Sequence, residues 1–119
     1  MTYAKGAHYE RDLIEFLKER GFSAVRIAGS GHKAPADILA IRKGLVLAIE
    51  SKAHAQKPYL PRDRVAEFTQ WCEQAGALGF LAWRAPHQEW RFLPLKSLIE
   101  SNFDDEFWLT KETLLRAIL

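Results

Sequence analysis

The feature that most limits how this chain can fold is the stretch from Asp37 to Lys52, with the sequence DILAIRKGLVLAIESK. It is typical of two strands joined by a tight Arg-Lys-Gly turn, with a carboxylate opening the first strand. Side chains alternate across a strand, so we expect Glu50 and Lys52 on one face and Ser51 on the other. An acid beside a base at the end of an apolar strand favours chemistry over packing. We interpret it as a divalent-metal phosphodiesterase site.

Length and composition fit one domain that spans residues 1–119, because 119 residues can bury a single core without disulfide or metal staples. No apolar run approaches the roughly 18 residues that a membrane-spanning helix needs. The first residues, MTYAKGAHYERD, lack the apolar centre of a signal peptide, and the single cysteine, Cys72, cannot form an internal disulfide. We therefore expect a cytoplasmic protein with no membrane partner.

Charge is divided unevenly along the chain. Residues 1–64 contain twelve Lys and Arg against seven Asp and Glu, a net charge of +5. Residues 65–119 contain five against eight, a net charge of −3. The basic excess falls on the same part of the chain as the suspected site, which favours an acidic partner, and nucleic acid is the commonest one. The alternative is a chance scatter of surface charge.

A helix is predicted from about Lys5 to Arg20, with Gly21 as its stop. Its apolar residues place Glu10 on the buried stripe and Arg11 at the border of that stripe. A buried carboxylate is costly unless a positive group meets it. The alternative is that the first turn overhangs the core and leaves Glu10 solvated.

The remaining elements alternate between strand and helix patterns. A loop over residues 29–36 holds Ser30 and Lys33 and could close over a phosphate, or could be a simple connector. The fold class is mixed α/β, a single domain with a central mixed five-stranded sheet flanked by helices. The other expected elements are strands at 23–28, 78–84 and 90–94, a helix from 61 or 62 to 75, and a last helix from Thr110 to Leu119.

Magnesium prefers oxygen ligands and is usually held by a few carboxylates together with waters and phosphate oxygens. Asp37, Glu50 and Glu10 are the candidate metal ligands, and the backbone carbonyl of Ser51 could add another. Lys52 fits as an activator of the attacking water or as a stabiliser of charge on the phosphorus centre. The alternative is a purely structural salt bridge between Glu50 and Lys52.

Phosphate contacts are expected from basic side chains in the first half of the chain. Arg11 and Arg26 would hold phosphates near the cut, because a guanidinium group matches phosphate oxygens in a bidentate way. Four further candidates for DNA contacts are Lys5, Lys33, Lys57 and Arg62.

The spacing of Asp37 and the Glu50-x-Lys52 motif, with twelve residues between the two acids, resembles the PD-(D/E)xK nuclease superfamily. A longer likeness narrows this further, because the chain resembles the archaeal-type Holliday junction resolvase (Hjc) family over nearly its whole length. The segments that carry the likeness are KGAHYERDLI (5–14), GFSAVRIAGS (21–30), DILA (37–40), IESK (49–52) and RDRVAEF (62–68).

The resemblance implies a restriction-endonuclease-like fold and a catalytic centre of Glu10, Asp37, Glu50 and Lys52, with Ser30 at a position important for cleavage. It further implies a homodimer that uses Mg²⁺, with Mn²⁺ as a substitute and no organic cofactor. Such a dimer resolves four-way DNA junctions by paired nicks in opposing strands during recombination and repair. The alternatives are a related nuclease for duplex or single-stranded DNA, and a non-catalytic junction-binding module.

Two departures from the family pattern bear on the site. Ser51 stands where relatives often have an apolar residue, a change that an outward-pointing side chain would tolerate. In the helix after residue 61, the family tends to place two aromatic residues four apart; here Phe68 matches the first position and Cys72 fills the second, with Trp71 beside it. Phe68 and Trp71 are therefore candidates for the dimer interface, and the alternative is that both are ordinary core residues.

Overall fold

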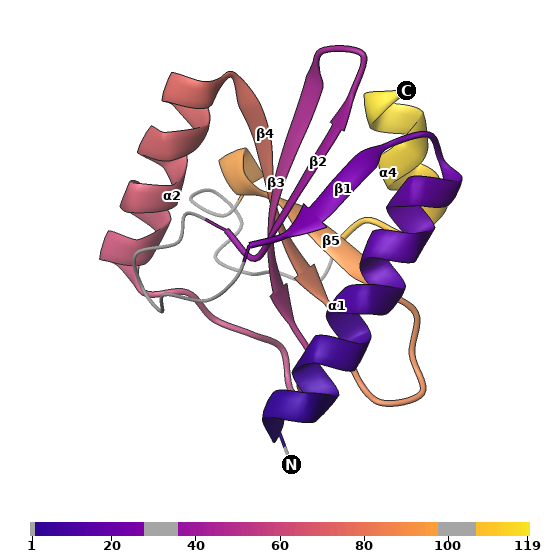
Figure 1. The fold of residues 1–119 in the computed structure, drawn as a ribbon. Coiled ribbons are helices and arrows are strands. Elements are labelled where there is room, and N and C mark those ends of the chain that lie inside the picture. Colours follow the sequence, from indigo (N-terminus) through magenta and orange to yellow (C-terminus); the bar gives the residue numbers. More distant parts are fainter. Residues whose placement is uncertain (1, 28–35, 98–106) are drawn as a thin grey trace.

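The computed structural model describes residues 2–27, 36–97 and 107–119. Five strands form one sheet in the order β1-β2-β3-β4-β5. Among the strands that the structure describes, only β3 and β4 run parallel, and the helix α2 makes the crossover between them (Figure 1). The described elements are α1 (Thr2–Glu19), β1 (Ser23–Arg26), β2 (Ile38–Arg42), β3 (Leu45–Lys52), α2 (Arg62–Ala75), β4 (Ala77–Trp83), β5 (Arg91–Pro94) and α4 (Lys111–Ile118).

The predicted hairpin is present and pairs β2 with β3. Its two-residue turn has positive φ at both positions, 48° at Lys43 and 87° at Gly44, as in the hairpin turns that match the twist of antiparallel strands. The register places Ile38 opposite Ile49. Asp37, one residue before β2, therefore lies beside the C-terminal end of β3, where its backbone N–H donates to the Ile49 carbonyl at 2.9 Å.

The predicted stop after the first helix is confirmed at Gly21, whose φ is 89°. A side chain there would be strained, and a Cβ atom would meet the Arg42 Nε atom at 2.9 Å. The helix ends at Glu19, one residue before the predicted end at Arg20, and begins at Thr2, three residues earlier than predicted. The apolar stripe does not mark this first turn, because the stripe begins further along the chain.

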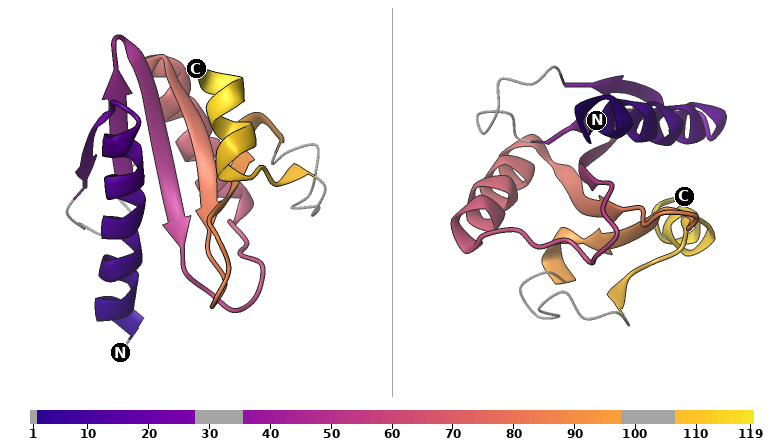
Figure 2. Two further views of the ribbon diagram at one scale, coloured as in Figure 1. Left: turned by 90° about the vertical axis from the view of Figure 1, so that its right-hand side faces the viewer. Right: turned by 90° about the horizontal axis from the view of Figure 1, so that it is seen from below.

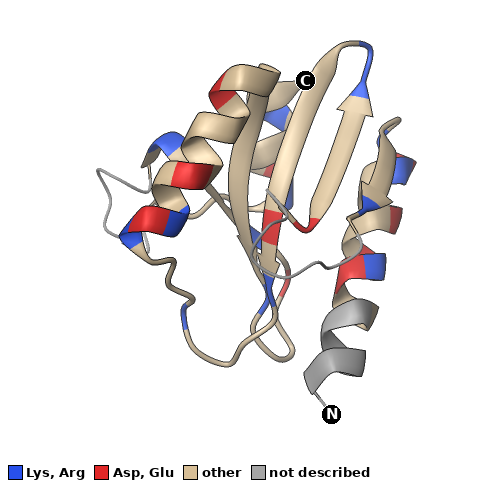
Figure 3. Ribbon diagram, turned by 60° about the vertical axis from the view of Figure 1, so that its left-hand side comes forward, with Lys and Arg blue, Asp and Glu red and all other residues tan. Residues whose placement is uncertain are grey.

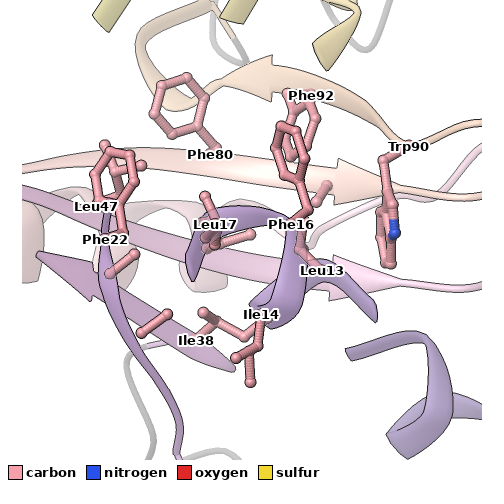
Figure 4. Packing of buried hydrophobic residues seen from close by; sticks show 14 of the residues in the cluster. Leu13, Ile14, Phe16, Leu17, Phe22, Ile38, Leu47, Phe80, Trp90 and Phe92 are labelled. Carbon is pink, nitrogen blue, oxygen red and sulfur yellow. The ribbon is translucent and has the colours of Figure 1, made fainter. Parts of the chain in front are cut away.

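The helices α1 and α4 cover one face of the sheet, and α2 covers the opposite face (Figure 2). Leu13 and Leu17 of α1 are fully buried against the strands (Figure 4). The helix α4 adds Leu114 to the same cluster. Thr110 caps α4, because its hydroxyl accepts from the Thr113 backbone N–H at 3.2 Å. The mixed α/β prediction, with a five-stranded sheet flanked by helices, is confirmed.

The opposite face is covered by α2. Phe68 is 1% exposed and packs with Cys72 and Leu81 inside this one chain. This burial corrects the prediction that Phe68 lies at a dimer interface and agrees with the alternative that it is a core residue. Trp71 is only partly buried. Burial raises the pKa of the Cys72 thiol to about 11, so this cysteine is a packing residue.

Among the helices that the structure describes, none is long and apolar enough to cross a membrane.

Candidate active site

The last residues of β3 carry the centre of the site. The Glu50 side chain is on the α2 face of the sheet and is 9% exposed. Lys52 lies on the same face, as predicted, with its Nζ atom 3.5 Å from Glu50 Oε2. Arg64 reaches down from the first turn of α2 and donates from Nη2 to Glu50 Oε1 at 3.1 Å. Each oxygen of this buried carboxylate thus faces one cation.

The two cations do not fully compensate the burial of Glu50. Its pKa is raised above the usual range for glutamate, first by desolvation and second by the negative charge of Asp37. Lys52 and Arg64 act in the opposite direction and are outweighed. A carboxylate in this state gains from one more positive charge at close range, which a divalent cation would supply.

Asp37 interacts with residues on both faces of the sheet. Its Oδ2 atom accepts from the Ser51 backbone N–H at 2.8 Å and lies 3.3 Å from the Ser51 hydroxyl oxygen. It also acts on Glu50 through its charge. Acidic segments at the start of β2 and near the end of β3 lie next to each other in the middle of the molecule (Figure 3). The predicted meeting of these two carboxylates is therefore present in the fold.

Glu10 arrives from α1 on the other face. Its side chain is 15% exposed, and its Oε1 atom accepts from Nε of Arg26 on β1. This pairing supplies the positive group that a buried carboxylate requires, and the alternative of a solvated Glu10 is wrong. The Oε2 atom lies 3.1 Å from the Ser51 hydroxyl oxygen.

Ser51 differs from expectation in its surroundings. It points to the face opposite Glu50, as strand alternation predicts, but α1 covers that face and the hydroxyl lies between Glu10 and Asp37. The prediction of an outward-pointing Ser51 side chain is therefore wrong. Strand alternation correctly predicts the face on which Ser51 lies. It does not predict that Glu10 of α1 contacts Ser51 on that face.

The predicted DNA contacts fall into two groups. Arg11, Lys57 and Arg62 are exposed, and Arg26 is exposed but paired with Glu10. Three other predicted residues cannot be placed. Ser30 and Lys33 lie outside the described residues, as does the side chain of Lys5.

The arrangement fits a metal ion that is held by only a few side-chain ligands. Within residues 2–27, 36–97 and 107–119, no three His, Cys, Asp or Glu side chains converge closely enough to hold an ion. Magnesium does not need three, because it is commonly bound by one or two carboxylates with waters and phosphate oxygens. Asp37 and Glu50 form such a pair, and the raised pKa of Glu50 is the local sign of uncompensated negative charge.

Arg64 is the member of the site that the sequence did not predict. It lies in the RDRVAEF segment but was not distinguished from the other basic residues there. The sequence shows only that Arg64 lies in the first turn of a helix that follows β3. The packing of α2 on the sheet is needed to show that this side chain points at Glu50.

Comparisons with known proteins point to one family. A family model described as "Archaeal holliday junction resolvase (hjc)" matches residues 1–118. The Archaeoglobus fulgidus crossover junction endodeoxyribonuclease Hjc is 39% identical over 106 residues, which are 84% of this chain and 77% of that protein. The Methanocaldococcus jannaschii protein of the same name is 35% identical over 81 residues, 67% of this chain and 59% of that protein.

A solved structure of Archaeoglobus fulgidus Hjc, a Holliday junction resolvase, superposes with a TM-score of 0.64 at 34% identity. The match covers 77% of this chain and 74% of that one. Sequence and fold thus agree along most of the chain. This chain therefore belongs to the archaeal Holliday junction resolvase family.

Proposed function

We propose that this chain is a metal-dependent endonuclease that resolves four-way DNA junctions by paired nicks in opposing strands, during recombination and repair. Its family and the printed names of its relatives support junction cleavage. The observation that carries the chemistry is the position of Asp37, which contacts Ser51 and increases the pKa of Glu50 on the neighbouring strand.

The resident ion is proposed to be Mg²⁺, with Mn²⁺ as a substitute and no organic cofactor. Asp37, Glu50 and the Ser51 backbone carbonyl would hold the ion, and Glu10 would add a third carboxylate beside Asp37. When bound, the ion supplies a Lewis acid that polarises the scissile phosphate and lowers the pKa of the attacking water.

The chain's own cations have two tasks. Lys52, beside Glu50, orients the attacking water or stabilises negative charge as the phosphorus centre becomes pentacovalent. In the free protein, Arg26 is paired with Glu10 and Arg64 with Glu50. When a phosphate group enters, both guanidinium groups are within the site to bind its oxygens, because phosphate is the other anion that guanidinium fits well.

Substrate recognition is proposed to rest on phosphates and branched shape. Arg11, Lys57 and Arg62 are exposed on the part of the chain with the basic excess, and Lys5 and Lys33 belong to the same part. Ser30 is kept as a candidate near the cut. Contacts of this kind carry little base specificity and make binding strongly dependent on salt.

A homodimer is proposed because one chain offers one site, whereas a junction resolved symmetrically needs two cuts. A twofold axis would place two sites on one surface and match the approximate symmetry of the junction. Trp71, which is only partly buried, remains the candidate interface residue. Sedimentation of the free protein tests this assembly.

The cytoplasmic location also remains a prediction.

The direct test compares a four-way junction with a duplex of the same sequence, each incubated with purified protein and Mg²⁺. We expect paired nicks in opposing strands of the junction and little cutting of the duplex. Equal cutting of both substrates would instead support a nuclease without preference for branched DNA. Junction binding with no cutting in Mg²⁺ or Mn²⁺ would support a non-catalytic junction-binding module.

A further inference from the structure

The Ser51 hydroxyl lies where one helix and two strands of the site meet. Its oxygen is 3.1 Å from Glu10 Oε2 and 3.3 Å from Asp37 Oδ2. The backbone N–H of the same residue donates to Asp37 Oδ2 at 2.8 Å. Ser51 thus meets both carboxylates, one of them through two of its polar groups.

The hydroxyl carries one proton and faces two acceptors. The two oxygen–oxygen distances are similar, so the hydroxyl can donate to either Glu10 or Asp37 and restrains both side chains. The two carboxylate oxygens can be no farther apart than the sum of these distances. Without a donor between them they would repel each other, and the Glu10 side chain would be free to turn away from Asp37.

The restraint matters because Glu10 comes to the site from far away in the chain. It is 41 residues from Ser51 in sequence and reaches the strands only by the packing of α1. On its other side it is drawn towards Arg26 of β1. The Ser51 hydroxyl is the contact that opposes this pull and keeps the second oxygen of Glu10 directed at Asp37.

We propose that Ser51 is a positioning residue of the metal site: through Glu10, its hydroxyl holds the carboxylate carried by α1 against Asp37 and strengthens the binding of a divalent cation. This inference rests on the proposed function, because it concerns the same metal site. It assigns a task to the side chain that is separate from that of the Ser51 backbone carbonyl.

The experiment measures Mn²⁺ affinity by isothermal titration calorimetry, without DNA. The variants are Ser51→Ala, which removes the hydroxyl, and Ser51→Thr, which keeps it on a residue that strands accept well. Ser51→Ala is also made in a Glu10→Gln background. Ser23→Ala, at an exposed position of β1, is the matched control. Melting temperatures are recorded for every variant, so that a loss of folding is recognised.

Ser51→Ala should weaken Mn²⁺ binding about tenfold, the lower end of the range for groups that orient metal ligands. Ser51→Thr should restore most of the affinity, and Ser23→Ala should leave it unchanged. In the Glu10→Gln background, Ser51→Ala should add almost nothing, because the residue through which Ser51 acts has lost its charge. A merely structural hydroxyl would lower the melting temperature and leave this dependence on Glu10 absent.

The proposal is overturned if Ser51→Ala binds Mn²⁺ as tightly as the wild type, or if the loss is equally large with Glu10 and with Gln at position 10. Failure of the proposed function has a different signature. A wild type that binds Mn²⁺ but cuts no junction refutes junction resolution and leaves the result for Ser51 standing. A wild type that binds no Mn²⁺ refutes both.

Discussion

Each face of the sheet contributes one glutamate to the site, and the two glutamates have different surroundings. On the α2 face, Glu50 is buried and meets the cations Lys52 and Arg64. On the α1 face, Glu10 meets one cation, Arg26, and one neutral hydroxyl. On the α2 face, an incoming ion and phosphate must therefore rearrange the ion pairs of Glu50. On the α1 face, the contacts of Glu10 hold its carboxylate in position. Asp37 contacts Ser51 and acts on Glu50 through its charge, so it is linked to both arrangements.

The largest expected effect comes from breaking the residue that the two faces share. Asp37→Asn should reduce junction cleavage in Mg²⁺ by about 10³-fold or more, the order expected when a group that holds transition-state charge is removed. Junction binding in a gel-shift assay should be largely retained, because phosphate contacts lie elsewhere. Asp63→Asn, at an exposed position in the first turn of α2, is the control. Surviving activity in Asp37→Asn would show that another residue is the ligand.

A somewhat smaller loss is expected when the α2 face loses its lysine. Lys52→Met should lower kcat for junction cleavage by about 10²- to 10³-fold, because the charge that acts on the water or the phosphorane is gone. Mn²⁺ affinity should stay near the wild-type value, since no metal ligand is removed. Lys18→Met, on the exposed side of α1, serves as the control. If Mn²⁺ binding fell together with kcat, the role of Lys52 would lie in building the site instead.

The pH dependence of cleavage separates the arginines of the two faces. Arg64 lowers the pKa of Glu50 by its charge and its hydrogen bond, so Arg64→Gln should raise that pKa further. Because metal binding requires the ionised carboxylate, the acid limb of kcat/KM should move to higher pH. Arg26→Gln, on the other face, should leave that limb where it is. The comparison fails if Arg64→Gln moves the limb to lower pH or if both variants move it equally.

The smallest expected effect concerns stability without metal. The folded chain binds the Glu50 proton more tightly than the unfolded chain does, since the pKa is raised by burial and by Asp37. The stability gained from this carboxyl group is therefore present in acid and is lost as pH rises through the raised pKa. Glu50→Gln imitates the protonated form, so its melting temperature relative to wild type should increase from pH 4 to pH 8. A relative melting temperature that falls over that range would contradict the shift.

Most of the framework of the site follows from the sequence because its signals are local. Alternation along residues 45–52 and the Lys43-Gly44 turn predict the hairpin, and with it the neighbourhood of Asp37 and Glu50. The buried stripe of α1 likewise predicts that Glu10 faces the sheet. These inferences need only periodicity and turn chemistry.

The rest of the site depends on how distant elements pack. Arg26 and Glu10 are 16 residues apart and meet only because α1 covers β1. Arg64 points at Glu50 because of the rotation of α2 on the sheet, which no local pattern specifies. Phe68 shows the same limit, since an aromatic residue at helical spacing suits a core and a dimer interface equally well until the packing is known.

The most direct test of the shared site is anomalous diffraction from crystals of the protein soaked with Mn²⁺. We predict one strong peak bound by the carboxylates of Asp37 and Glu50, with Glu10 beside it and the contact between Arg64 and Glu50 weakened. A peak bound by other carboxylates, or none near Asp37 in crystals that hold Mn²⁺ elsewhere, would contradict the claim that the two faces meet at one metal.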